Sequence, residues 1–126
     1  MGKEVESYKS SRKGNFVFDN ILGTDYIMHV ISRKKLIAFY EQPKHQGAKG
    51  QIEAWYAEAV HAQWASPADV KVQYGSASII GDNRVIFNIA GNKYRLIVRT
   101  NYGSKTVFVR FIGTHKAYDK IDAEVI

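Results

Sequence analysis

The second half of the chain alternates apolar and polar residues in three short runs. The runs cover about residues 84–89, 94–101 and 106–112, and an alternation with period two is typical of β-strands. Turn residues separate them, in Ala90-Gly91-Asn92-Lys93 and Tyr102-Gly103-Ser104-Lys105. The pattern therefore predicts a three-stranded antiparallel meander.

The preceding part of the chain has apolar residues at helical spacing. This spacing predicts helices over about 33–42 and 48–64. A shorter helix is expected to begin at Ser66-Pro67-Ala68-Asp69, because serine caps a helix and proline and aspartate suit its first turn. Short strands are expected at 28–31 and 77–80. This order of elements predicts an α+β domain with helices on one face of a small, largely antiparallel sheet.

Residues 1–27 differ from the rest of the chain in composition. They are polar and lack periodicity, and the charges of their four basic and four acidic residues sum to zero. We expect an N-terminal extension over 1–27, either mobile or preceding a true start at Met28, and one compact domain over 28–126. Phe16-Val17-Phe18 is a short apolar cluster that could dock on the body or extend a sheet edge.

If the two hairpin turns are symmetric, they fix the register of the strands and therefore which side chains share a face of the sheet. The first hairpin would then put Val85, Phe87, Ile89, Tyr94, Leu96 and Val98 in the core, and the second would add Val107, Val109 and Phe111. The opposite face would gather four arginines beside Phe108, namely Arg84, Arg95, Arg99 and Arg110. A slip of one residue would bury several arginines, which favours this register.

The composition narrows the class of protein. The formal net charge is +6, and the excess belongs entirely to residues 28–126, which indicates a polyanionic partner. There is no cysteine, so disulfides and thiolate chemistry are excluded. No apolar run is long enough for a membrane span and no signal peptide is evident, so the cytoplasm is the expected location.

The stretch from Phe108 to Lys120 carries the candidate chemistry. This stretch predicts a buried strand that stops at Gly113, with His115, Tyr118 and Asp119 lying at the end of the strand. Metal-free RNA cleavage needs a base, an acid and positive charge around the phosphate, and histidine titrates in the useful range. We expect the catalytic residues to be His115, Tyr118 and Arg110, and the RNA-binding residues to be Arg84, Lys93, Arg95, Arg99, Phe108 and Lys116.

Simpler interpretations remain open for these residues. His115 and Asp119 could be ordinary helix caps, and a solvated sheet face commonly carries arginines. Asp119 is expected to orient His115 or cap the last turn, because its charge would repel phosphate. The histidines lack metal-ligand spacing, so neither a metal site nor another cofactor is expected.

Several segments resemble the HigB toxins of bacterial type II toxin–antitoxin systems, across essentially all of residues 28–122. The segments are Met28-His29-Val30-Ile31-Ser32, Ser66-Pro67-Ala68-Asp69, Gly81-Asp82-Asn83-Arg84-Val85-Ile86-Phe87-Asn88-Ile89, Gly91-Asn92-Lys93-Tyr94-Arg95-Leu96 and Arg110-Phe111-Ile112-Gly113-Thr114-His115-Lys116-Ala117-Tyr118-Asp119-Lys120-Ile121. Residues 1–27 depart from this pattern, since such toxins usually begin near Met28.

The resemblance implies a RelE-like fold and an endoribonuclease that cuts messenger RNA, commonly in the ribosomal A site. It also implies a HigA-type helix-turn-helix antitoxin as partner. The site candidates it implies are Arg95, Arg99, Arg110, His115 and Tyr118. Two alternatives stay open: a non-catalytic RNA- or ribosome-binding module, and a degenerate toxin that only binds its antitoxin.

Overall fold

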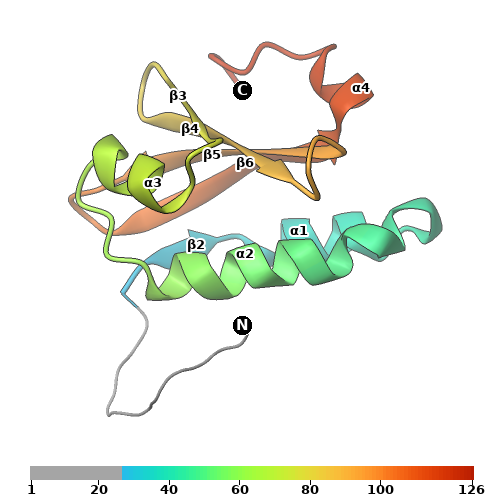
Figure 1. Ribbon diagram of the computed structural model, residues 1–126, viewed down its shortest axis with the longest axis horizontal. Helices are drawn as coiled ribbons and strands as arrows, with labels where there is room; N and C mark the ends of the chain where they lie inside the picture. The colour runs from blue at the N-terminus through green and yellow to red at the C-terminus, as the bar shows by residue number, and fades with distance from the viewer. Residues whose placement is uncertain (1–26) are drawn as a thin grey trace.

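A computed structural model describes residues 27–126, which build one five-stranded sheet (Figure 1). The strands are β2 (His29–Ile31), β3 (Ser78–Ile80), β4 (Arg84–Ile89), β5 (Tyr94–Asn101) and β6 (Thr106–Thr114). Their order across the sheet is β2-β6-β5-β4-β3. β2 runs parallel to β6 and the other neighbours are antiparallel. The predicted α+β class is confirmed, while the Phe16–Phe18 cluster lies outside the described residues.

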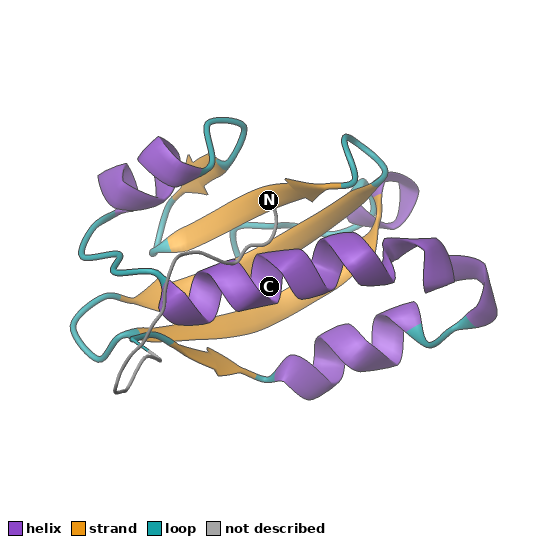
Figure 2. Ribbon diagram, turned by 60° about the horizontal axis from the view of Figure 1, so that its bottom comes forward, coloured by secondary structure: helices purple, strands orange, loops and turns teal. Residues whose placement is uncertain are grey.

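Helices α1 (Arg33–Tyr40) and α2 (Lys49–His61) lie side by side on one face of the sheet (Figure 2). A 3₁₀ helix, η1 (Pro43–Ala48), joins them, so the first predicted helix ends earlier than expected, before the proline. α3 (Pro67–Gln73) begins as predicted, but the Asp69 carboxylate accepts the Ala65 N–H at 2.8 Å and the Ser66 side chain makes no capping bond. None of the helices described within 27–126 is long and apolar enough to cross a membrane.

The core lies between the sheet and the pair α1 and α2. Leu36, Ile52 and Trp55 from these helices are buried against apolar side chains of the sheet. The register predicted for the first hairpin is confirmed, and its six core residues are all buried: Val85, Phe87, Ile89, Tyr94, Leu96 and Val98. Burial of this one face therefore orients the three long strands.

The second hairpin contains a β-bulge that the alternation did not predict. Its register runs as expected as far as Val98 opposite Val109, but Ile97 then pairs with Phe111, so Arg110 is the extra residue. The prediction that Phe111 joins the core is therefore wrong, because the bulge returns it to the opposite face. The prediction that the strand stops at Gly113 is also wrong, since β6 continues to Thr114.

Gly113 accommodates the ring of Phe111. A Cβ atom on Gly113 would lie only 2.6 Å from Cζ of Phe111, closer than carbon atoms approach in folded proteins. Both residues face away from the helices, and Gly113 pairs with Arg95 on β5. The absence of a side chain at this position lets the aromatic ring lie close to the strand beside Arg95.

We predict that Gly113→Ala displaces the Phe111 ring and lowers the free energy of unfolding by about 1 kcal/mol, at the small end of overpacking costs because the ring is partly exposed and can swing outward. Denaturant titration measures the change, with Gly75→Ala as control, since a Cβ there meets nothing within 4 Å. In a Phe111→Leu background the substitution should have a smaller effect. Equal effects in both backgrounds would contradict this account.

Candidate active site

The candidate site lies on the face of the sheet opposite α1 and α2, called here the open face. Arg84 pairs with Arg99 and Asn88 with Arg95, so the predicted sharing of this face is confirmed for these positions. Arg95 and Arg99 are four residues apart on β5, which corresponds to about 13 Å along a strand. Buried Ile97 lies between them. The open face therefore has two separate ends.

The first end is formed where β6 passes into the single helical turn α4 (His115–Tyr118). Thr114 caps this turn, since its Oγ1 accepts the Ala117 N–H at 3.1 Å. The His115 N–H donates to the Lys93 carbonyl at 3.1 Å, which ties α4 to the β4–β5 turn. His115 thus stands on a capped turn that follows β6 directly and is bonded to the β4–β5 turn, rather than in the loop expected from the sequence.

Four side chains meet at this end, called here the histidine end: Arg95, His115, Tyr118 and Asp119. His115 Nδ1 lies 3.5 Å from Asp119 Oδ2, and the rings of His115 and Tyr118 are 6.4 Å apart between centroids. Arg95 Cζ lies 5.7 Å from the centre of the Tyr118 ring, within cation–π distance.

This geometry suits proton transfer beside an anion. A carboxylate near Nδ1 orients the imidazole of His115 and leaves Nε2 to exchange a proton with a substrate. The exposed side chains of Lys93 and Lys116 add positive charge at the histidine end. The expectation that Asp119 orients His115 is therefore consistent with the structure.

The second end of the open face, called here the arginine end, contains Arg99, Phe108 and Arg110. These residues line a groove of about 490 Å³. Arg110 Nε donates to a main-chain oxygen of Ile126, the last residue, at 3.0 Å, and the chain after α4 passes over the open face to reach it (Figure 1). Arg110 lies at the bulge, opposite the step between Ile97 and Val98, and is therefore about 12 Å along the sheet from Thr114, so Arg95 rather than Arg110 accompanies His115.

Arg84 does not fit the expectation of an RNA contact. Only 6% of its surface is exposed, and its Nη1 binds Asp82 Oδ2 at 2.8 Å. Arg99 Nη2 binds Asp82 Oδ1 at 2.9 Å. Hydrogen bonds from these two guanidinium groups hold the pKa of Asp82 below its usual range. Arg84 therefore secures the carboxylate that positions Arg99.

Sequence reasoning missed Asp82 and Phe111. Asp82 and Asn83 have φ values of 59° and 61° in the turn between β3 and β4, a conformation that aspartate and asparagine tolerate. The Asp-Asn pair before a strand was the available signal for this turn. Phe111 gave no signal, because an apolar residue next to a bulge looks like any other core residue.

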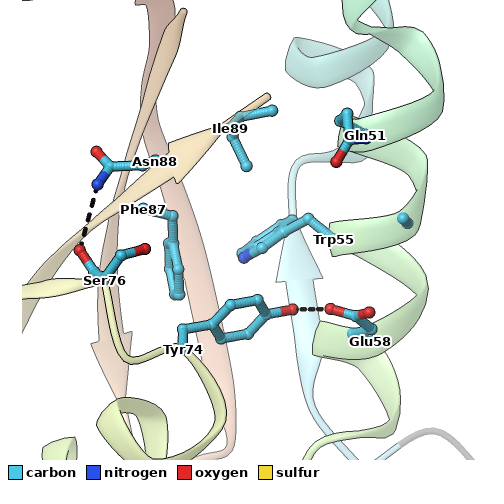
Figure 3. A pocket seen from close by; sticks show the side chains of 9 residues that line it. Gln51, Trp55, Glu58, Tyr74, Ser76, Phe87, Asn88 and Ile89 are labelled. Atoms are coloured by element: carbon cyan, nitrogen blue, oxygen red, sulfur yellow. Dashed lines mark hydrogen bonds between the residues drawn. The ribbon is translucent and has the colours of Figure 1, made fainter. Parts of the chain in front are cut away.

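A small cavity lies away from the open face, between α2 and β4 (Figure 3). Its volume is about 120 Å³, and Trp55, Tyr74 and Phe87 line it together with Glu58. The Tyr74 hydroxyl donates to Glu58, and burial together with this bond raises the pKa of Tyr74. The lining contains no arginine, lysine or histidine, so the cavity does not suit an anionic substrate. Within residues 27–126 no cluster of three metal-ligating side chains is present.

We predict that Asp82→Asn lowers the free energy of unfolding at neutral pH, because Arg84 would stay buried without its counter-charge. Asparagine keeps the turn, since it tolerates positive φ. The folded pKa of Asp82 is lowered, so the advantage of the wild type is complete above the ordinary value of 3.8 and is lost as pH falls through the lowered value. Denaturant titrations across acidic pH measure this. A difference that persists undiminished at the lowest pH would refute the prediction.

Comparisons with known proteins identify the family of this chain. A family model described as HigB_toxin, RelE-like toxic component of a toxin-antitoxin system, matches residues 48–121, more than half of the chain. The mRNA interferase toxin HigB of Escherichia coli K12 is 27% identical over 95 residues, covering 73% of this chain and 88% of that protein. The mRNA interferase HigB of Shigella flexneri matches to the same extent. With α4, β5 and β6 all inside the matched region, the chain belongs to the HigB family of RelE-like toxins from toxin–antitoxin systems.

Proposed function

We propose that this toxin is an endoribonuclease that cuts messenger RNA on the ribosome. The observation that carries the proposal is the histidine end, where Arg95, His115, Tyr118 and Asp119 meet beside exposed lysines. Curated relatives named mRNA interferase support the same activity. All of these residues lie within 28–126, so we assign the activity to that part of the chain.

The reaction we propose is attack of a ribose 2′-oxygen on the adjacent phosphorus. The 2′-O–P bond forms as the P–O5′ bond breaks, which leaves a 2′,3′-cyclic phosphate and a 5′-hydroxyl. One group removes the 2′-OH proton and another protonates the leaving 5′-oxygen. His115 and Tyr118 are assigned to these two transfers, Asp119 positions His115, and Arg95 stabilises the negative charge of the phosphorane.

A member of a toxin–antitoxin family has an antitoxin as partner. We propose that this partner is a HigA-type helix-turn-helix protein. Messenger RNA in the ribosomal A site is the proposed substrate, contacted by Lys93, Arg95, Arg99 and Lys116.

His115→Ala should reduce cleavage by about 10²- to 10⁴-fold, the usual contribution of general acid–base catalysis, and leave ribosome binding unchanged. Mapping new mRNA 5′ ends, with and without ribosomes, measures cleavage. His29→Ala is the matched control, because His29 is an exposed histidine on β2, at the edge of the sheet. If His115→Ala cuts at the normal rate, the catalytic assignment is wrong.

The same assay tests the chemistry. A 2′-deoxy nucleotide at the cut position should block the reaction, because the proposed nucleophile is then missing. The products should end in 2′,3′-cyclic phosphate. Cleavage of the deoxy-substituted RNA would rule out 2′-OH attack, whereas ribosome binding without any cleavage by the wild type would favour a binding module.

Arg95→Ala should weaken RNA binding and make it less dependent on salt. Each phosphate contact to single-stranded RNA contributes about 0.7 to the slope of log K against log salt concentration, so the loss of one contact should reduce the slope by about that amount. Binding titrations over a salt series measure it, with Lys34→Ala on α1 as the control away from the open face. Equal slopes for both variants would remove Arg95 from the RNA contact.

A further inference from the structure

The arginine end of the open face is built differently from the histidine end. Its groove is lined by Asn83, Arg99, Asn101, Phe108 and Arg110, among others. Arg99 and Phe108 are cross-strand partners on β5 and β6, so cation and ring stand next to each other. Phe108 is 36% exposed although it lies within a strand of the sheet. A single exposed apolar residue is ordinary, but this one stands between two arginines in a groove.

The charge of the groove favours an anion. Asp82 neutralises one of the two arginines that bind it, Arg84 and Arg99, and exposed Arg110 adds a further positive charge. Arg110 Nε already donates to an anionic acceptor, a main-chain oxygen of the last residue Ile126, at 3.0 Å. That oxygen belongs to the terminal carboxylate, and it marks a position where a phosphate oxygen would take its place on the guanidinium group.

We propose that the arginine end is a second RNA subsite, in which one nucleobase stacks on Phe108 while Arg99 and Arg110 hold its phosphate. An aromatic ring beside cationic side chains is the arrangement that binds single-stranded RNA. The proposal rests on the proposed function, since it takes the bound strand to be the one that is cut at the histidine end.

The separation of the two ends locates this nucleotide. Arg95 and Arg99 are about 13 Å apart along β5, and Ile97 with Phe111 lies between the two ends. The stacked base is therefore not adjacent to the cut bond. Asn101, whose Oδ1 accepts the Ser104 N–H at 3.0 Å, and Asn83 present carboxamides at the groove. Such groups both donate and accept hydrogen bonds, so the subsite contributes to base preference.

The test combines a change in the protein with a change in the RNA. The RNA carries a 2′-deoxy nucleotide at the cut position to prevent cleavage, and one abasic nucleotide is moved through the flanking positions. Affinity is measured on ribosomes programmed with each RNA, for the full wild-type chain and for Phe108→Thr. Threonine removes the ring but suits a strand. Ile79→Thr is the matched control, because Ile79 is also an exposed apolar residue of a strand.

We expect Phe108→Thr to weaken binding of the intact RNA by about 5- to 150-fold, the range for loss of one base stack. At one position not adjacent to the cut, the abasic nucleotide should weaken wild-type binding to the same extent and should not weaken binding of Phe108→Thr further. Phe108→Tyr should bind like the wild type, and Ile79→Thr should be unaffected.

If Phe108→Thr and the abasic nucleotide weaken binding independently of each other at every position, the proposal of a subsite is wrong. The proposed subsite is also overturned if Phe108→Thr weakens binding of the antitoxin but not of RNA. The same holds if the wild type binds ribosomes with equal affinity whichever of the intact and abasic RNAs they carry. Because the binding RNA cannot be cut, the result does not depend on catalysis. Loss of the subsite with normal dependence of cleavage on His115 would leave the proposed function intact.

Discussion

The structure depends on burial of one face of β4, β5 and β6 beneath α1 and α2. Apolar burial is worth about 25 cal/mol per Å², and the side chains on this face, such as Phe87 and Leu96, are almost fully buried. Because side chains alternate along a strand, burial of one face also determines which residues point away from the helices. The arginines of the open face are placed by the core rather than by any contact among themselves.

The bulge at Arg110 changes which side chains of β6 lie on each face of the sheet. Without it, Phe111 would be in the core and β6 would present a different set of side chains beyond that point. With it, Ile112 lies opposite Leu96 on the core side, and Phe111 lies over Gly113 on the open face. One extra residue thus separates the arginine end from the histidine end and places an aromatic ring between them.

The charges of the open face are partly compensated within the protein. Asp82 binds Arg84 and Arg99 from a turn of positive φ, and Asp119 stands beside His115. These carboxylates lower the net charge but hold the cationic groups in defined positions. A guanidinium group that is held in place loses less conformational entropy when it binds phosphate, so its contact is stronger than its net charge alone suggests.

The sequence by itself determined the fold class, the register of the first hairpin and the position of His115, Tyr118 and Asp119 just after a core strand. These follow from local rules, namely the period of apolar residues, turn residues between strands, and histidine and tyrosine just after a core strand. The tertiary structure decided the burial of Arg84, the separation of Arg110 from His115 and the position of Phe111 on the open face. Each of these three features depends on contacts between strands, on the bulge or on an ion pair across a turn. The linear pattern of apolar and polar residues does not encode which residue of a strand becomes the extra residue of a bulge.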